Sequence, residues 1–466
     1  MSISVANGGT WKPDLAGDGT LHDRLVEALR GDILGNRLAP GTRLPTHRDL
    51  AFELGIGVGT VTKAYAEVER LGLINSRVGR GSFVSDMSAT DSTQVDLALN
   101  LPPTEPAASR LPDVLSRIAR RADISAFSQF APPLGFDAHR QIAADWLCHN
   151  AGFGNADWKR LAICSGAQQA MFLALDHLCE PGDTVMAEAA TFHGFKAITE
   201  YRRWNILGLP IDPKGLVPSA FEKAAKSGRS RVLYVQPTLQ NPTTSSMDRE
   251  RREAIVSIAS RYDVTIVESD IYSPLARRSG GNAEDLVPLV ALAPERTFYV
   301  GGWSKVMAPG LRAGFLLVPN TEVIQVIGRT MRAHCYAANA LGPLIAAEWI
   351  ETGEADEILN EIVDHATLRN KLIVDQLGDK IQPLSYPGSL HVWMPLPGGI
   401  AERVAAYAYR HDILLTPPSA TTVEPDPATG IRVCSCASPD LASLRRALTV
   451  LRDALDNTAR IDISII

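Results

Sequence analysis

Apolar segments of strand length alternate with longer helical segments through the C-terminal part of this chain. Strand-like segments cover residues 231–235, 264–267 and 297–300, and an amphipathic stretch over residues 249–262 separates the first two. Such alternation predicts βαβ units, in which helices cover a mainly parallel sheet. Folds of this kind bind ligands at the carboxyl ends of their strands, so we expect the chemically active side chains directly after the strand-like segments.

A lysine and an arginine follow one of these strands at a short spacing. Lys305 ends the run Gly-Gly-Trp-Ser-Lys after the 297–300 strand, and Arg312 lies seven residues further on. A lysine amine can form an imine with an aldehyde cofactor, and a guanidinium can hold the cofactor's phosphate. The pair resembles the Schiff-base loop of fold-type I aminotransferases, which implies pyridoxal 5'-phosphate as the cofactor and Lys305 as the catalytic residue that carries it.

Further segments after strands fit the same resemblance. Residues 165–170 follow a strand-like segment and open a helix, whose backbone N–H groups can receive a phosphate. By the resemblance, an aromatic residue stacks on the pyridine ring, and an asparagine and a tyrosine bond the ring hydroxyl. The predicted cofactor-binding residues are Gly166, Ala167, Gln168, Phe192, Asn241, Asp270, Tyr272, Ser304, Lys305 and Arg312.

The acidic residue departs from the family pattern. The resemblance implies a carboxylate against the pyridine nitrogen, which keeps that nitrogen protonated and makes the ring an electron sink. Direct register assigns Ser269 to this place, and Asp270 comes one residue later. Either the strand shifts so that Asp270 serves, which we expect, or the nitrogen lacks its acid. Gly302 and Phe130 also stand where relatives often have a serine and a tyrosine.

An arginine near the C-terminus completes the candidate site. The segment Ile-Arg-Val over residues 431–433 resembles the strand whose arginine grips a substrate α-carboxylate in a bidentate pair. We therefore assign Arg432 to an amino-acid-like substrate or effector. The resemblance implies an α/β fold-type I aminotransferase-like domain, with a mainly parallel sheet and a small C-terminal α/β subdomain.

The first 84 residues have a different, mostly helical pattern. Apolar residues recur every four positions over residues 21–33, which predicts a first helix. A second helix starts at Thr46, where Asp49 completes a capping pattern, and a third has an apolar face over residues 61–71. A hairpin around residues 78–80 follows, so the segment is predicted to be a winged helix-turn-helix.

This segment resembles the DNA-binding domain of GntR-family regulators, with shared motifs from Pro40-Gly41 to Gly79-Arg80-Gly81. The resemblance implies contacts with phosphates, with base edges of the major groove and, from the hairpin, with the minor groove. The predicted DNA-binding residues are Arg43, Arg48, Thr60, Thr62, Lys63 and Arg80. Many relatives have Ser-Arg where this chain has Gly57-Val58, so an arginine that could bond a guanine edge is missing. We therefore expect the sequence preference of DNA binding to depend more on DNA shape.

A polar, aperiodic stretch joins the two parts. We predict a DNA-binding domain over residues 1–84, a linker over 85–96 and the aminotransferase-like domain over 97–466. The fusion resembles the MocR subfamily, which implies a homodimer that binds operator DNA and senses an amine or amino-acid-like effector through pyridoxal phosphate. Two alternatives stay open: an active aminotransferase using an amino acid and a 2-oxo acid, and a regulator whose large domain keeps only dimer contacts.

The amino-acid composition excludes few classes of protein. The net charge of −6 does not exclude nucleic acid, because an average over the chain can hide a basic face. The six cysteines are scattered without metal-ligand spacing, which predicts reduced core thiols and no metal site. No signal peptide and no membrane-spanning run is recognisable, so we expect a cytoplasmic protein with no membrane partner.

Overall fold

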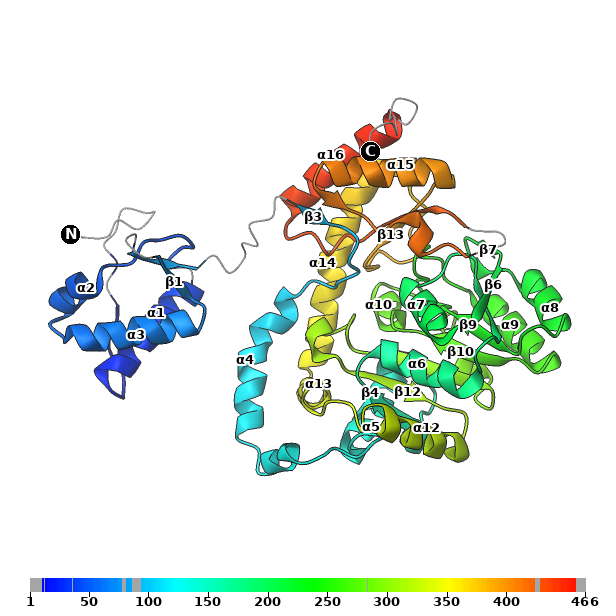
Figure 1. Ribbon diagram of the computed structural model, residues 1–466, viewed down its shortest axis with the longest axis horizontal. Coiled ribbons are helices and arrows are strands. Elements are labelled where there is room, and N and C mark those ends of the chain that lie inside the picture. Colours follow the sequence, from blue (N-terminus) through cyan, green and yellow to red (C-terminus); the bar gives the residue numbers. More distant parts are fainter. Residues whose placement is uncertain are drawn as a thin grey trace. The chain divides into compact units, whose positions relative to one another are not determined.

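The computed structural model (Figure 1) describes residues 11, 13–35, 37–77, 81–85, 94–282, 284–423 and 428–457. The chain divides into two compact units, residues 1–93 and residues 94–466. The first unit holds the predicted helix-turn-helix, and the second holds the predicted α/β domain.

In its described residues, the N-terminal unit has three helices and an antiparallel hairpin, as predicted. Leu29 and Tyr65 are buried in the core that these elements share. The second helix begins where Thr46 accepts a hydrogen bond from the backbone N–H of Asp49, and it ends at Gly55, which has a left-handed conformation. The elements are α1 (Leu21–Leu34), α2 (His47–Leu54), α3 (Val58–Arg70), β1 (Ile74–Arg77) and β2 (Gly81–Val84).

A seven-stranded sheet forms the centre of the second unit, in the order β4-β12-β11-β10-β9-β5-β6. β12 runs antiparallel to both of its neighbours, and the remaining pairs are parallel, which confirms the predicted mainly parallel sheet. The strands are β4 (Leu161–Cys164), β5 (Thr184–Glu188), β6 (Asn205–Leu209), β9 (Val232–Val235), β10 (Thr265–Ser269), β11 (Thr297–Gly302) and β12 (Gly314–Leu317).

Helices cover both faces of this sheet. On β12, Phe315 and Leu317 belong to one core cluster, whereas Leu316 between them belongs to another. Alternation of this kind is expected for a strand that is buried on both sides. The helices around the sheet are α4 (Glu105–Ala119), α5 (Asp137–Asn150), α6 (Ala167–Leu178), α7 (His193–Arg202), α8 (Pro218–Lys226), α9 (Arg249–Arg261), α10 (Ser273–Arg278), α11 (Leu289–Leu292), α12 (Thr321–His334) and α13 (Leu341–Glu351).

A smaller α/β subdomain follows the sheet, and the long helix α14 leads into it (Figure 1). It has its own core, which includes Ile373 of α14 and Leu448 of the last helix. β13 and β15 pair antiparallel. The elements are α14 (Glu354–Leu377), β13 (Val392–Pro395), α15 (Gly398–Arg410), β14 (Ile413–Leu414), β15 (Gly430–Val433) and α16 (Leu441–Asp456).

The beginning of the second unit joins this C-terminal subdomain. Val95 and Asp96 form β3, which pairs in parallel with β14, so these two residues of the predicted linker belong to the second unit. Pairing with a strand more than 300 residues away fixes a segment that has no apolar periodicity of its own. Two short strands, β7 (Ile211–Asp212) and β8 (Gly215–Leu216), form a separate hairpin.

Two further findings concern the thiols and the helices. Four cysteines are buried and Cys148 is half-buried, but Cys335 is exposed, so the prediction of core thiols is wrong for Cys335. Among the described residues, no helix combines the length and the apolar character that crossing a membrane requires.

Candidate ligand pocket and nucleic-acid interface

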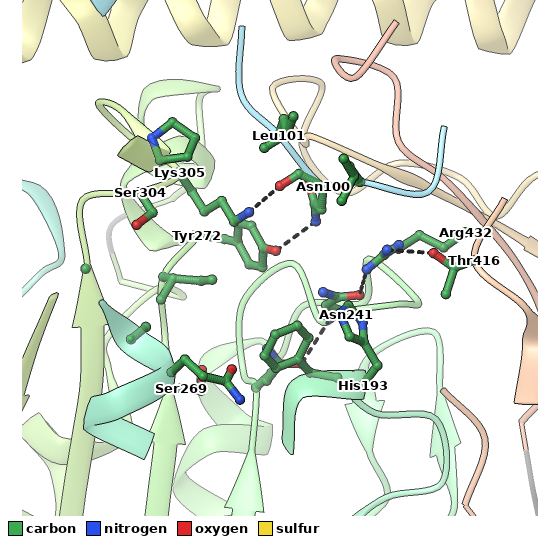
Figure 2. A pocket seen from close by; sticks show the side chains of 18 of the residues that line it. Asn100, Leu101, His193, Asn241, Ser269, Tyr272, Ser304, Lys305, Thr416 and Arg432 are labelled. Atoms are coloured by element: carbon green, nitrogen blue, oxygen red, sulfur yellow. Dashed lines mark hydrogen bonds between the residues drawn. The ribbon is translucent and has the colours of Figure 1, made fainter. Parts of the chain in front are cut away.

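A cavity of about 630 Å³ lies at the carboxyl ends of the central strands of the sheet. Residues from the sheet, from the C-terminal subdomain and from the segment before α4 line it together (Figure 2). Most of the predicted cofactor and effector residues are among them, although they are spread over more than 260 positions of the chain. These lining residues are Ala167, Gln168, Phe192, Asn241, Tyr272, Ser304, Lys305, Arg312 and Arg432.

One end of the cavity has the character of an anion site. Helix α6 begins at Ala167, and its N-terminus directs backbone N–H groups and the positive end of the helix dipole to this place. Arg312 lies beside it and donates a hydrogen bond from Nη2 to the backbone oxygen of Ser165 over 3.3 Å. The hydroxyl of Ser304 is buried without a hydrogen-bond partner among the described residues. A phosphate fits these donors.

Glycines allow Arg312 and the neighbouring strand to lie close to the N-terminus of α6. Gly166 has a φ of 84°, and a Cβ atom there would lie 2.8 Å from Nη2 of Arg312. A Cβ atom on Gly314 would lie 2.6 Å from the backbone nitrogen of Ala167. Gly302 lines the cavity next to the same backbone, so the family's serine hydroxyl is absent from this wall. Gly166 was predicted as a cofactor ligand, and it contributes by shaping the wall rather than by lining the cavity.

Lys305 enters the cavity from a turn that follows β11. The turn is held by the buried Trp303, whose backbone oxygen accepts hydrogen bonds from the N–H groups of Val306 and Met307. The Lys305 amine donates a hydrogen bond to the backbone oxygen of Asn100. Burial, with Arg432 and Arg312 nearby, lowers the pKa of Lys305 to about 8. At pH 7 roughly a tenth of such amines is neutral and nucleophilic.

Arg432, on β15, reaches the cavity from the C-terminal subdomain. Its Nη1 donates to Oδ1 of Asn241 over 2.8 Å, and its Nη2 donates to the backbone oxygen of Ala98 over 2.5 Å and to Oγ1 of Thr416 over 2.8 Å. Its Nε is buried and has no partner among the described residues. All three acceptors are neutral groups, so an anionic ligand group can still neutralise this buried charge.

The prediction for Asp270 requires a correction. β10 pairs in regular register with β9 and β11, without a shift that would turn Asp270 inward. Side chains of a regular strand alternate between its two faces. Ser269 therefore faces the cavity (Figure 2), whereas the Asp270 carboxyl lies near Arg252 and Arg277 on the other side. Burial raises the pKa of Asp270, and those two arginines oppose the rise.

The structure adds cavity residues that the sequence did not indicate. Asn100 lies with its Nδ2 2.8 Å from Oη of Tyr272 and 3.0 Å from Nδ1 of His391. His193 also lines the cavity, and burial, together with Arg432 and Lys305, lowers its pKa to about 4. No local signal marks these residues, because their partners are far away in the chain.

In the N-terminal unit, most of the predicted DNA-binding residues are accessible. Arg43, Arg48, Thr62 and Lys63 are exposed, and Thr60 is half-buried. Thr62 of α3 lies 3.2 Å from Nδ1 of His47 of α2, which links the two helices of the helix-turn-helix. A depression of about 440 Å³ runs between the start of α2 and β2, with Arg43 and Arg48 on its wall. Arg80 lies outside the described residues.

Two family models match the chain, one for each unit. The family described as aminotransferase class I and II matches residues 92–451, and the bacterial regulatory proteins of the gntR family match residues 21–84. The chain therefore belongs to the aminotransferase class I and II family and carries a GntR-type helix-turn-helix domain at its N-terminal end. This combination is the architecture of MocR-type regulators.

Two relatives that align with this chain over most of their length are transcriptional regulators by name. The chain is 27% identical to YdeF of Bacillus subtilis, an uncharacterised HTH-type transcriptional regulator, over 96% of this chain and 97% of the relative. It is 26% identical to PdxR of Corynebacterium glutamicum, an HTH-type pyridoxine biosynthesis transcriptional regulator, over 79% of this chain and 82% of the relative.

Solved structures confirm the predicted fold. An archaeal alanine:glyoxylate aminotransferase superposes with a TM-score of 0.71 at 22% identity, over 85% of this chain and 94% of that chain. LysN of Thermus thermophilus, an α-aminoadipate aminotransferase, superposes with a TM-score of 0.70 at 23% identity, over 79% and 94%. The second unit thus has the aminotransferase fold.

Proposed function

We propose that this protein is a DNA-binding transcriptional regulator that uses pyridoxal 5'-phosphate, attached at Lys305, to sense an amino compound. The observation that carries the proposal is the convergence of Lys305 and Arg432 in one cavity of a chain that also carries a GntR-type domain. An α-amino acid has an amine for the first position and a carboxylate for the second. Operator binding would place the protein in the cytoplasm, as we expected from the sequence.

The cavity fits this cofactor at three points. The N-terminus of α6, Arg312 and the unpartnered hydroxyl of Ser304 would hold the phosphate. Asn241 and Tyr272 would bond the ring hydroxyl, and Phe192 would cover the ring. When bound, pyridoxal phosphate supplies an aldehyde that forms a reversible covalent bond with primary amines.

Ser269 favours sensing over transamination. Proton movement at a substrate's α-carbon needs a ring that withdraws electrons, and an acid at the pyridine nitrogen strengthens that withdrawal. The wall formed by β10 offers the neutral hydroxyl of Ser269, whereas Asp270 lies on the other side of the strand. Amine recognition does not need such an acid. An aminotransferase remains the second candidate, because Lys305 and Arg432 are the groups that this chemistry uses.

A spectral titration tests the attachment point. Full-length protein is titrated with pyridoxal phosphate while the visible absorbance of the cofactor–lysine bond is recorded, for the wild type, Lys305→Ala and the exposed control Lys214→Ala. We expect the band in the wild type and the control only. A band in Lys305→Ala would overturn the assignment.

DNA binding tests the regulatory part of the proposal. DNA selected from a random library serves as operator, and its affinity is measured with cofactor and with a panel of amino acids. We expect at least one amino acid to change the affinity by about 5- to 150-fold, the range of typical coupling free energies. An affinity that never responds, combined with steady conversion of an amino acid and a 2-oxo acid, would favour the aminotransferase.

The proposal includes a homodimer that binds two half-sites. Phe130 is 83% exposed, and the centroid of its ring lies 4.9 Å from that of Tyr336, which is itself 43% exposed. Exposed apolar surface of this kind supports an interface with a second copy. Light scattering after size-exclusion chromatography should give twice the chain mass of 50.3 kDa. A monomer bound to a single half-site would contradict this part.

A further inference from the structure

The first segment of the second unit crosses the ligand cavity. Residues 94–97 are held to the C-terminal subdomain, because the N–H of Val95 donates to the oxygen of Asp412 over 2.7 Å and that of Leu97 to Leu414 over 2.9 Å. Residues 98–101, here called the strap, then run along the cavity wall and lead to α4 (Figure 2). In sequence, only Leu97 separates the strap from β3 and from the end of the predicted linker.

Lys305 and Arg432, two of the cations that line the cavity, hold the strap by its backbone. The Lys305 amine donates to the backbone oxygen of Asn100, and Nη2 of Arg432 donates to that of Ala98. Oγ1 of Thr416 also donates to the Ala98 oxygen, over 3.2 Å. The two side chains proposed to bind the cofactor and the effector are therefore both engaged with the backbone of the same four-residue segment.

The side chain of Asn100 adds a third attachment. Its amide contacts Tyr272 and the fully buried His391, and His391 in turn lies 3.4 Å from the backbone oxygen of Gln240. Oδ1 of Asn100 is buried without a partner among the described residues, so one hydrogen-bond acceptor of the strap has no donor in this position. Asn100 is thus a positioning residue that ties the strap to the cavity wall.

A bound carboxylate competes for the same donors. Nη2 of Arg432 carries two hydrogens, which are directed to Ala98 and to Thr416. A bidentate carboxylate uses Nη2 whether it approaches end-on with Nη1 or side-on with Nε. It therefore displaces one of these two acceptors. Likewise, condensation of the Lys305 amine with an aldehyde releases the aldehyde oxygen as water and leaves at most one of the three ammonium hydrogens on the nitrogen, so the bond to Asn100 is weakened or lost.

We propose that the strap is the element that reports occupancy of the cavity to the DNA-binding unit. Filling the positions at Lys305 and Arg432 releases the carbonyls of Asn100 and Ala98, and the strap takes up another position. The identity of the ligand rests on the proposed function, but the hold of the two cations on the strap does not. The segment that moves is continuous in sequence with the chain that leads to the helix-turn-helix.

Hydrogen exchange of the unliganded, full-length protein tests the hold itself. The amides of Ala98 and Leu99 are protected by Oδ1 of Asp96, at 2.7 and 3.0 Å, so loss of the strap's position exposes them. We expect Lys305→Met to exchange about tenfold faster than the wild type over residues 95–101, and the exposed control Lys214→Met to match the wild type. Unchanged exchange in Lys305→Met would overturn the proposal.

The same measurement with pyridoxal phosphate and L-alanine tests the response, while visible absorbance reports whether the cofactor is attached. We expect faster exchange of the strap in the loaded wild type, and an operator affinity that responds in the wild type but not in Asn100→Ala. Asn205→Ala, an exposed amide on β6, is the matched control. Attached cofactor with an unchanged strap would refute the inference. An absent band with a Lys305-dependent strap would refute only the proposed function.

Discussion

The surroundings of Lys305 determine the pKa of its amine. Its pKa falls to about 8 because the amine is buried and two arginines lie near it. Arg432 is buried in the same cavity wall, and its hydrogen-bond acceptors are neutral groups. Its positive charge therefore still attracts an anion. Both side chains are therefore buried without an acidic hydrogen-bond partner among the described residues, as their proposed roles require.

The lowered pKa predicts a pH dependence of cofactor attachment. Only the neutral amine attacks an aldehyde, and the neutral fraction rises about tenfold per pH unit below the pKa and levels off above it. The attachment rate should therefore rise from pH 6 to about pH 8 and change little from pH 8.5 to pH 9.5. Stopped-flow absorbance measures this rate, and a rise that continues unchanged to pH 10 would contradict the lowered pKa.

Ser269→Asp places a carboxylate where the strand faces the cavity. We expect single-turnover amino transfer from L-alanine to bound cofactor to become at least about tenfold faster, because a charged acid at the pyridine nitrogen strengthens the electron sink. The decay of the cofactor's visible band measures this reaction. Ser257→Asp, on the exposed face of α9, should leave the rate unchanged. An unaltered rate in Ser269→Asp would show that Ser269 does not limit this chemistry.

Two elements place the polar groups of the cavity by simple geometry. β10 presents Ser269 and hides Asp270, because a regularly paired strand turns neighbouring side chains to opposite faces. α6 directs its N-terminus at the anion site, because β4 ends at Cys164 and the chain turns at Gly166. In both cases the element's position, rather than the residue type alone, decides which groups reach a ligand.

Gly166→Ala tests the approach of Arg312 to α6. A Cβ atom at position 166 meets the guanidinium at 2.8 Å and also strains the positive φ. We expect the affinity for pyridoxal phosphate to fall by about tenfold or more, because a displaced Arg312 loses a charge-assisted bond of about 1.5–3 kcal/mol. Equilibrium absorbance titration measures the affinity.

Gly182→Ala is the matched control for that substitution. Gly182 has a φ of 96°, but no atom lies within 4 Å of its Cβ position. It shares the backbone strain without the contact, so it should lower the melting temperature and leave the affinity unchanged. Equal losses of affinity in both variants would assign the effect to stability.

The whole molecule combines an aminotransferase-like unit with a GntR-type helix-turn-helix unit in one chain. The aminotransferase-like unit brings residues from several distant segments to one cavity, whereas the N-terminal unit is built from local helices around one small core. The strap lies near the beginning of the second unit, after residues 94–97. The coupling between ligand and DNA that we propose would run along the chain, from residues 98–101 through the predicted linker.

At this scale, Arg48→Ala tests the DNA-binding face. Loss of one phosphate contact should weaken binding of all sequences by about tenfold and reduce the slope of log affinity against log salt by about one. Fluorescence anisotropy at several salt concentrations measures both quantities. Arg30→Ala removes an arginine of the same unit that pairs with Glu27, and it should change neither. A loss restricted to one DNA sequence would instead indicate that Arg48 reads a base.

The sequence by itself determined the elements and most of the cavity residues. Periodicity and capping predict α1 to α3, and the apolar strands predict the parallel sheet, because these signals are local. Residues such as Lys305 and Tyr272 could be placed in one cavity because strand ends of a parallel sheet meet at one edge.

Only the tertiary structure decided which face of β10 meets the cavity and what the cavity's cations bind. The register that hides Asp270 is set by pairing with β9 and β11, and Asn100 approaches Lys305 across 205 residues of chain. The strap has no periodicity that predicts its path. Its position results from strand pairing at β14 and from hydrogen bonds with Arg432, interactions that form only when distant segments are packed together.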